Sequence, residues 1–124
     1  RWQPADDGTI VTGNREERIL ARSGGTGQNG NGINVFRAGN VIVSGNQIAD
    51  CAFSAIRSNS GSNIQIGGNT CRASGETAIY SEFAFEGAVI ANNIVDGAAN
   101  GISVGNFNEG GWLATVPGTL VRTL

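Results

Sequence analysis

The sequence predicts an all-β fold, a single-stranded parallel β-helix (solenoid) of about five coils with a 23-residue repeat. Three apolar columns recur at this spacing. The first column contains Ile33, Ile56, Ile79 and Ile102. The second contains Val43, Ile66 and Val89, and the third contains Ile48, Cys71 and Ile94. Because all three columns keep one period, each repeat is expected to form one coil that buries its apolar face against its neighbours.

The segments between the turns are short, which favours strands over helices. Apolar runs of a few residues alternate with Gly, Asn and Ser turns, so three strands fit into each repeat. Residues of one column would then lie about 4.8 Å apart, as in adjacent strands. Asn46, Asn69 and Asn92 are expected to form a ladder at a turn, where Asn tolerates a left-handed backbone and its amide bonds to the next Asn. The alternative, a β-sandwich, gives no reason for one period in three columns.

Several motifs resemble those of a known group of proteins. The segments G-I-N-V at Gly32–Val35, V-I-V-S-G-N at Val41–Asn46 and I-Q-I-G-G-N at Ile64–Asn69 resemble right-handed parallel β-helix repeats of the pectin-lyase-like superfamily. Within that superfamily, the stretch from Asn29 to Asn108 is similar to a family of twin-arginine-exported bacterial β-helix repeat proteins without an assigned activity. The resemblance implies right-handed coils and an exported, periplasmic or extracellular protein. Such motifs specify a fold and hardly specify a reaction.

The composition argues against several classes of binding partner. The chain has 124 residues, enough for one domain, and a formal net charge of −2, which argues against a nucleic-acid partner. No apolar run is long enough to cross a membrane. The chain contains no His, and its two Cys lack metal-type spacing, so neither a metal nor another cofactor is expected. A chain that begins at Arg1 without a signal peptide is expected to be a processed or excised piece.

The two cysteines are expected to be free thiols. Cys71 belongs to the third apolar column and should point into the core. Cys51 lies three positions further along its own coil, a displacement of up to about 10 Å in an extended chain. A disulfide needs Cα atoms within about 7 Å, so a bridge would require a corner that folds Cys51 back.

The repeats divide the chain into four segments. Residues 1–14 form a partial first coil, because Thr9–Asn14 matches Val41–Asn46 in character. The offset between these two segments is one repeat plus nine positions, so an insertion falls at 15–31, as a loop or a single helical turn over Arg15–Ala21. Regular coils occupy 32–104. A degenerate last coil follows at 105–124, with about four extra residues in Asn106–Trp112 and a match to the G-N-x-I motif at Gly118–Val121.

The ends of the stack lack convincingly polar caps. Stacked repeats end in open strand edges and apolar ladders, which natural solenoids cover with polar or helical terminal units. The chain is therefore expected to come from a longer β-helix or to associate end to end.

The candidate site is the outward face of the first strand of each coil. Alternation along a strand points Ile33 inward and its neighbours outward. One outward column contains Asn34, Arg57, Tyr80 and Ser103, and Phe36, Asn59 and Glu82 lie beside it. An aromatic ring stacks on a sugar face, while amides, hydroxyls and an Arg bind hydroxyls or carboxylates. The alternative is that Arg57 and Glu82 form a solvated pair worth at most ~1 kcal/mol, and Tyr80 is an ordinary exposed aromatic.

Two functions follow from these observations. The first is a structural β-helix repeat module of an exported bacterial protein, without catalytic activity of its own. The second is a carbohydrate-binding or polysaccharide-processing surface on the face just described. Polysaccharide lyases of the resembled superfamily use an Arg as base near calcium-binding acids. Arg57 near Glu82 is only partly similar, because no three carboxylates fall on adjacent coils.

Overall fold

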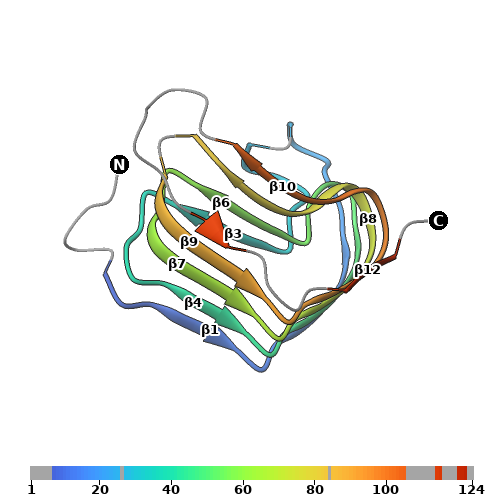
Figure 1. Ribbon diagram of the computed structural model, residues 1–124. Helices are drawn as coiled ribbons and strands as arrows, with labels where there is room; N and C mark the ends of the chain where they lie inside the picture. The colour runs from blue at the N-terminus through green and yellow to red at the C-terminus, as the bar shows by residue number, and fades with distance from the viewer. Residues whose placement is uncertain (1–6, 26, 84, 106–113, 116–119, 123–124) are drawn as a thin grey trace.

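The chain winds into a stack of parallel strands (Figure 1). The computed structural model describes residues 7–25, 27–83, 85–105, 114–115 and 120–122. Every strand pairing in this part of the chain is parallel, and each joins one coil to the next. The predicted parallel β-helix is therefore confirmed.

Three faces enclose the core. The first face contains β3 (Ile33–Phe36), β6 (Ile56–Asn59) and the C-terminal halves of β8 (Thr70–Glu82) and β10 (Ile94–Gly105). The second face contains β1 (Ile10–Thr12), β4 (Ile42–Ser44), β7 (Ser62–Gly67), β9 (Glu86–Ala91) and β11 (Ala114–Thr115). The third face contains β2 (Arg15–Ile19), β5 (Gln47–Cys51), the N-terminal halves of β8 and β10, and β12 (Leu120–Arg122).

The strands make about three complete turns, where the sequence predicts about five coils. Complete turns run from β3 to β5, from β6 into β8, and from the second half of β8 into β10. The partial turn of β1 and β2 precedes them, and the coil that contains β11 and β12 follows. The repeat count exceeds the number of complete turns because the end repeats contribute incomplete coils in the described part of the chain.

The first face keeps the period that the sequence predicts. Ile33, Ile56, Ile79 and Ile102 are partners in successive strands. Ile56 and Ile79 are fully buried. The predicted outward column of Asn34, Arg57, Tyr80 and Ser103 is also confirmed as a register.

The period lengthens by one position on the other two faces of the third turn. Ile66 pairs with Ile90 instead of Val89, and Cys71 pairs with Val95 instead of Ile94. The predicted core positions of Val89 and Ile94 are therefore wrong, and these side chains are 42% and 44% exposed. Val89-Ile90 and Ile94-Val95 are both apolar pairs, so a pattern of apolar residues cannot distinguish the two registers, although a one-residue shift exchanges the two faces of a strand.

The register shift of the third turn begins and ends at corners between the faces. Four positions separate Glu82 from Glu86, where three separate their partners Asn59 and Ser62. The shift is removed between Ala98 and Asn100, which pair with Ser74 and Thr77. Strand pairing is interrupted at both places, so the change in length leaves the straight parts of the strands intact.

A ladder of asparagines joins the coils between the second and third faces. It consists of Asn14, which is exposed at the end of the stack, and the buried Asn46, Asn69 and Asn93. The predicted member Asn92 is wrong because of the lengthened period, and it occupies the left-handed backbone position (φ 59°) that Gly45 and Gly68 occupy in the preceding coils. The left-handed residue is thus the one before the ladder, whereas the bonding between successive amides is confirmed for Asn46 and Asn69.

A strand begins the segment where the sequence predicts a loop or a helical turn. β2 pairs with β5, with Arg15 opposite Gln47 and Ile19 opposite Cys51. The added residues follow β2, and the chain rejoins the stack at Gly30, whose carbonyl accepts a hydrogen bond from the N–H of Phe53 (2.9 Å). Pairing with β5 satisfies the backbone of 15–19 in the way that a helical turn would do locally.

The strand pairings at the two ends of the stack agree with the alignment of repeats that the sequence predicts. Ile10–Thr12 pairs with Ile42–Ser44, in the alignment that the sequence predicts for Thr9–Asn14 and Val41–Asn46. Val121 pairs with Val95 and continues the column of Ile48 and Cys71, as the match at Gly118–Val121 predicts. The predicted extra loop in Asn106–Trp112 lies outside the described residues.

Both cysteines are buried free thiols. Burial raises the pKa of Cys51 to about 11 and that of Cys71 to about 12. Such thiols remain protonated at neutral pH and act as small apolar side chains of the core.

The isoleucine column supports a first prediction. Replacing Ile79 with Ala should lower the free energy of unfolding by roughly 2–5 kcal/mol, because a fully buried side chain is truncated. Val89→Ala is the matched control, since truncating this outward side chain should cost less than about 0.5 kcal/mol. Urea denaturation measures both. Equal losses would contradict the register of the third turn.

Candidate functional site

The candidate site is the outer surface of the first face, across four neighbouring strands (Figure 1). Its predicted residues differ in exposure. Asn34 is exposed, whereas Asn59, Tyr80 and Ser103 are half-buried. Arg57 and Glu82 are buried. The two columns are formed as predicted, but they do not make a uniformly solvated surface.

Arg57 and Glu82 form a buried ion pair that ties two coils together. Both the Nε and the terminal amino group of Arg57 donate to Oε2 of Glu82. Their side chains are only 9% and 3% exposed. The hypothesis of a solvated surface pair is therefore wrong. Alternation along a strand gives the direction of a side chain, and the tertiary structure decides whether anything covers it.

The environment of Glu82 favours its neutral form. Burial raises the pKa of this carboxyl above its usual value, and the nearby Glu76 adds to the rise. The charge and the hydrogen bonds of Arg57 act in the opposite direction and offset part of the effect. The charged form of Glu82 therefore depends on Arg57, because a buried charge that loses its partner is costly.

Tyr80 packs beside the same arginine. The guanidinium carbon of Arg57 lies 5.8 Å from the centre of the Tyr80 ring, within the range of a cation–π contact. The ring is half-buried, so part of it remains accessible. Arg57 on β6 thus contacts two side chains of the neighbouring strand β8, the ring of Tyr80 and the carboxylate of Glu82.

The two amides of the face already have neighbours within the chain. Asn34 Nδ2 donates to the carbonyl of Gly27 (3.3 Å), which brings the inserted segment after β2 to the edge of the first face. Asn59 Oδ1 accepts a hydrogen bond from Ser60 Oγ (2.8 Å). Each amide retains further donors or acceptors for a ligand, since an amide forms up to four hydrogen bonds.

An exposed contact between an aromatic ring and an arginine extends the face beyond the predicted site residues. Phe36 is 60% exposed, and the guanidinium carbon of Arg37 lies 4.9 Å from its ring centre. Arg37 has a left-handed backbone (φ 53°), which ends β3 and turns its side chain back over the ring. The sequence signal is the Phe-Arg dipeptide at the end of the first strand, but only the turn geometry brings the two side chains together.

The described residues contain neither a metal-binding cluster nor a membrane-spanning helix. In this part of the chain, no group of three or more His, Cys, Asp or Glu side chains is arranged to hold a metal ion. No helix there is long and apolar enough to cross a membrane.

Comparison with known proteins identifies a family and no individual relative. The family model of the right-handed β-helix region matches residues 7–110. No curated protein and no solved structure is significantly similar to the chain.

The buried ion pair supports a second prediction. Arg57→Ala should destabilise the protein at pH 7 by about 3–5 kcal/mol, because Glu82 is left as a buried charge without its partner. The variant also loses the attraction that lowers the pKa of Glu82, so this pKa rises further. A raised folded-state pKa favours the protonated protein, and the deficit relative to the parent should shrink as the pH falls toward 5.

Urea denaturation of the parent and the variant at pH 7 and pH 5 measures this difference. Arg15→Ala is the control, because its ion pair with Glu17 is exposed and should contribute little. A deficit that is the same at both pH values would show that the loss comes from packing and not from the charge of Glu82.

Proposed function

Because the chain belongs to the right-handed β-helix family, we propose that it is a structural repeat module without catalytic activity of its own. One observation carries this proposal. The first-face charges that most resemble a reactive site, Arg57 and Glu82, are buried and bonded to each other. Their geometry is that of a link between coils, and an arginine held in this way is poorly placed to act on a ligand.

The interior supports the same proposal. Asn46 and Asn69 are each bonded to the ladder residues of the coils on both sides, and the isoleucine column is continuous through four strands. Bonds of this kind fix the spacing of the coils and hold the outer faces in place. A module with these properties can serve as a rigid spacer or as a platform for other segments.

A second candidate function is favoured by the accessible part of the first face. Phe36 and part of Tyr80 are exposed aromatic surface. The amides lie on the same face, with Asn34 on the strand of Phe36 and Asn59 opposite Phe36 on the next strand. Aromatic rings with amide donors and acceptors suit an extended glycan, whose hydroxyl groups need hydrogen bonds and whose apolar sugar faces stack on rings. We therefore propose a carbohydrate-binding surface as the alternative.

Affinity electrophoresis on polygalacturonate and on a neutral β-glucan distinguishes the two proposals. A structural module should migrate without retardation on both gels. Retardation that Phe36→Ala and Tyr80→Ala remove, while the unfolding midpoint stays unchanged, would overturn the structural proposal and support the glycan surface. Val89→Ala is the matched control, because it removes an exposed apolar side chain from another face.

Export is part of the proposal and rests on the family resemblance of the repeats. The protein should appear in the periplasm or outside the cell when the complete gene is expressed in a bacterium with a twin-arginine pathway. Fractionation with a cytoplasmic marker measures this. Recovery with the cytoplasmic marker alone would contradict export.

A further inference from the structure

The chain leaves the stack between β2 and β3, in the inserted segment of residues 20–30. Leu20 is 55% exposed, and residues 22–25 are exposed as well. From Leu20 to Gly24, no backbone group is hydrogen-bonded to another described residue. Strand pairing satisfies these groups in the coils, whereas here they are left to solvent. The first half of the inserted segment is therefore held neither by strand pairing nor by burial.

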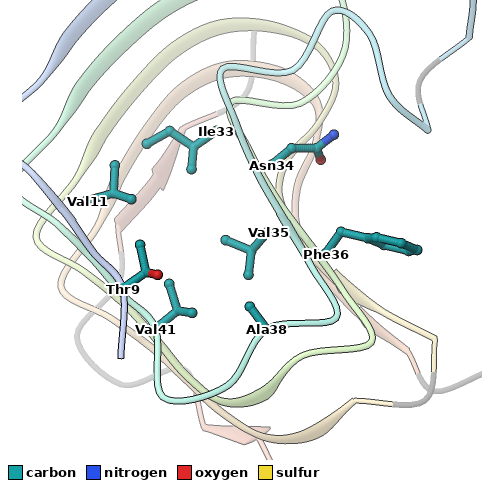
Figure 2. Close-up of a pocket in the computed structure, with 8 residues that line it drawn as sticks. All are labelled: Thr9, Val11, Ile33, Asn34, Val35, Phe36, Ala38 and Val41. Carbon is teal, nitrogen blue, oxygen red and sulfur yellow. The ribbon is translucent and has the colours of Figure 1, made fainter. Parts of the chain in front are cut away.

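The second half of the inserted segment is attached to the coils. The carbonyl of Gly30 accepts a hydrogen bond from the N–H of Phe53 (2.9 Å). Asn34 Nδ2 donates to the carbonyl of Gly27 (3.3 Å). Figure 2 shows the side chain of Asn34 pointing away from that of Val35, so this attachment lies on the outer side of β3. The exposed stretch thus ends where these bonds begin.

Arg22 lies in the middle of the exposed stretch. The 8 basic residues of the chain are all arginines. The side chain of Arg22 is exposed and forms neither an ion pair nor a hydrogen bond with another described residue. Ser23 and Gly24, which follow it, are small and exposed. An endopeptidase that cuts after arginine binds this combination, because it pairs with an extended backbone and places a carboxylate against the guanidinium.

Most of the other described arginines lie within paired strands. Arg15 and Arg18 belong to β2, which is paired with β5. Arg57 belongs to β6 and Arg72 to β8, and both strands are paired on their two sides. Arg122 ends β12, which is paired with β10. A protease has to separate a strand from its neighbours before it can cut at these arginines, and this opening is rare in a folded stack.

Arg37 is exposed, but the backbone around it is bonded on both sides. Its own N–H donates to the carbonyl of Asn59 (3.0 Å). Gly39 follows at a bridge to Ser62, in the turn that leads to the second face. The bond after Arg37 therefore lies in a short, bonded turn that does not extend into a protease cleft. Among the described residues, only Arg22 combines an accessible side chain with an unbonded backbone.

We propose that the Arg22–Ser23 bond is a processing site for an arginine-specific endopeptidase, and that the cut protein keeps its fold as two chains. Hydrolysis breaks the bond between the carbonyl carbon of Arg22 and the nitrogen of Ser23. The hydroxyl group of one water molecule adds to that carbon, and the remaining hydrogen of the water goes to the nitrogen. The cut thus creates a new C-terminus at Arg22 and a new N-terminus at Ser23. This proposal depends on neither of the two proposed functions.

The contacts of the N-terminal piece explain why it stays on the stack after the cut. β1 pairs with β4, and β2 pairs with β5. Asn14 donates both its backbone N–H and its Nδ2 to Oδ1 of Asn46, each at 3.0 Å. Val11 and Ile19 pack against the core. None of these contacts requires a continuous chain at residue 22, so they hold two chains together as they hold one.

Limited proteolysis of the full chain with trypsin tests the site. Denaturing mass spectrometry should detect the pieces 1–22 and 23–124 as the first products. The Arg22–Ser23 bond should be cut at least roughly tenfold faster than the bonds after the arginines of the paired strands and after Arg37, because those cuts wait for local unfolding. Arg22→Gln should remove the two pieces. Arg37→Gln is the matched control, since it replaces another exposed arginine and should leave the first cut unchanged.

Size-exclusion chromatography of the cut protein tests the two-chain product. The cut protein should elute with the uncut protein under native conditions, and the two pieces should separate in urea. Asn14→Ala should raise the dissociation constant of the short piece, measured by dilution, at least roughly threefold, because two hydrogen bonds to Asn46 are lost. Gln28→Ala is the control and should stay within about twofold, since Gln28 is exposed on the other side of the cut.

Three results would overturn the proposal. The first is a first cut at another arginine, which would show that a paired strand opens more readily than the inserted segment binds the protease. The second is an unchanged pattern of products in Arg22→Gln. The third is release of the short piece under native conditions, which would show that the first coil depends on a continuous chain.

Discussion

The stack of coils depends on the ladder of Asn14, Asn46, Asn69 and Asn93. Each Oδ1 of the last three accepts both the backbone N–H and the side-chain amide of the preceding Asn at 3.0 Å. The amide of Asn46 also donates to the carbonyl of Val11, and that of Asn69 to the carbonyl of Val43. The ladder therefore satisfies its own buried polar groups and those of the corner, which an apolar side chain would leave unpaired.

The left-handed residue before each ladder position makes these bonds attainable. Gly13, Gly45 and Gly68 have positive φ, and Asn92 takes the same conformation in the third turn. This conformation turns the chain between the second and third faces while the next side chain stays inside. Glycine adopts it without strain, and Asn is among the side chains that tolerate it best. The corner thus keeps its geometry when the period of the coils increases by one position.

The stack tolerates polar side chains in its interior at a cost. Ser58 and Ser81 occupy the inward column between Val35 and Val104, and their buried hydroxyls have no hydrogen-bond partner in the described structure. An unsatisfied buried hydroxyl costs about 1–3 kcal/mol. The Arg57–Glu82 pair adds a further desolvation cost on the outer side of the same strands. The buried apolar columns and the backbone hydrogen bonds between strands must offset the costs of the hydroxyls and of the ion pair. These two contributions therefore stabilise the first face more than its side-chain polar contacts do.

The sequence predicts the direction of the candidate-site side chains, but it does not predict their burial or all of their contacts. The direction of Asn34, Arg57, Tyr80 and Ser103 follows from alternation on a strand of known period, and the register agrees. The burial of Arg57 and Glu82 does not follow, because exposure depends on what the rest of the chain places over a residue. The contact of Arg37 with Phe36 was also missed, since it requires a left-handed turn that no residue type at position 37 demands.

The sequence by itself determined the parallel β-helix and the first-face register, because both rest on a repeated period. It also aligned Thr9–Asn14 with Val41–Asn46, through a shared motif and not through the period. Only the tertiary structure decided the shift in the third turn, where Val89-Ile90 and Ile94-Val95 fit either register and the position of Asn93 in the buried ladder settles the choice. It also decided which outward side chains meet solvent. A periodic pattern specifies how neighbouring coils align, whereas exposure depends on contacts that have no period.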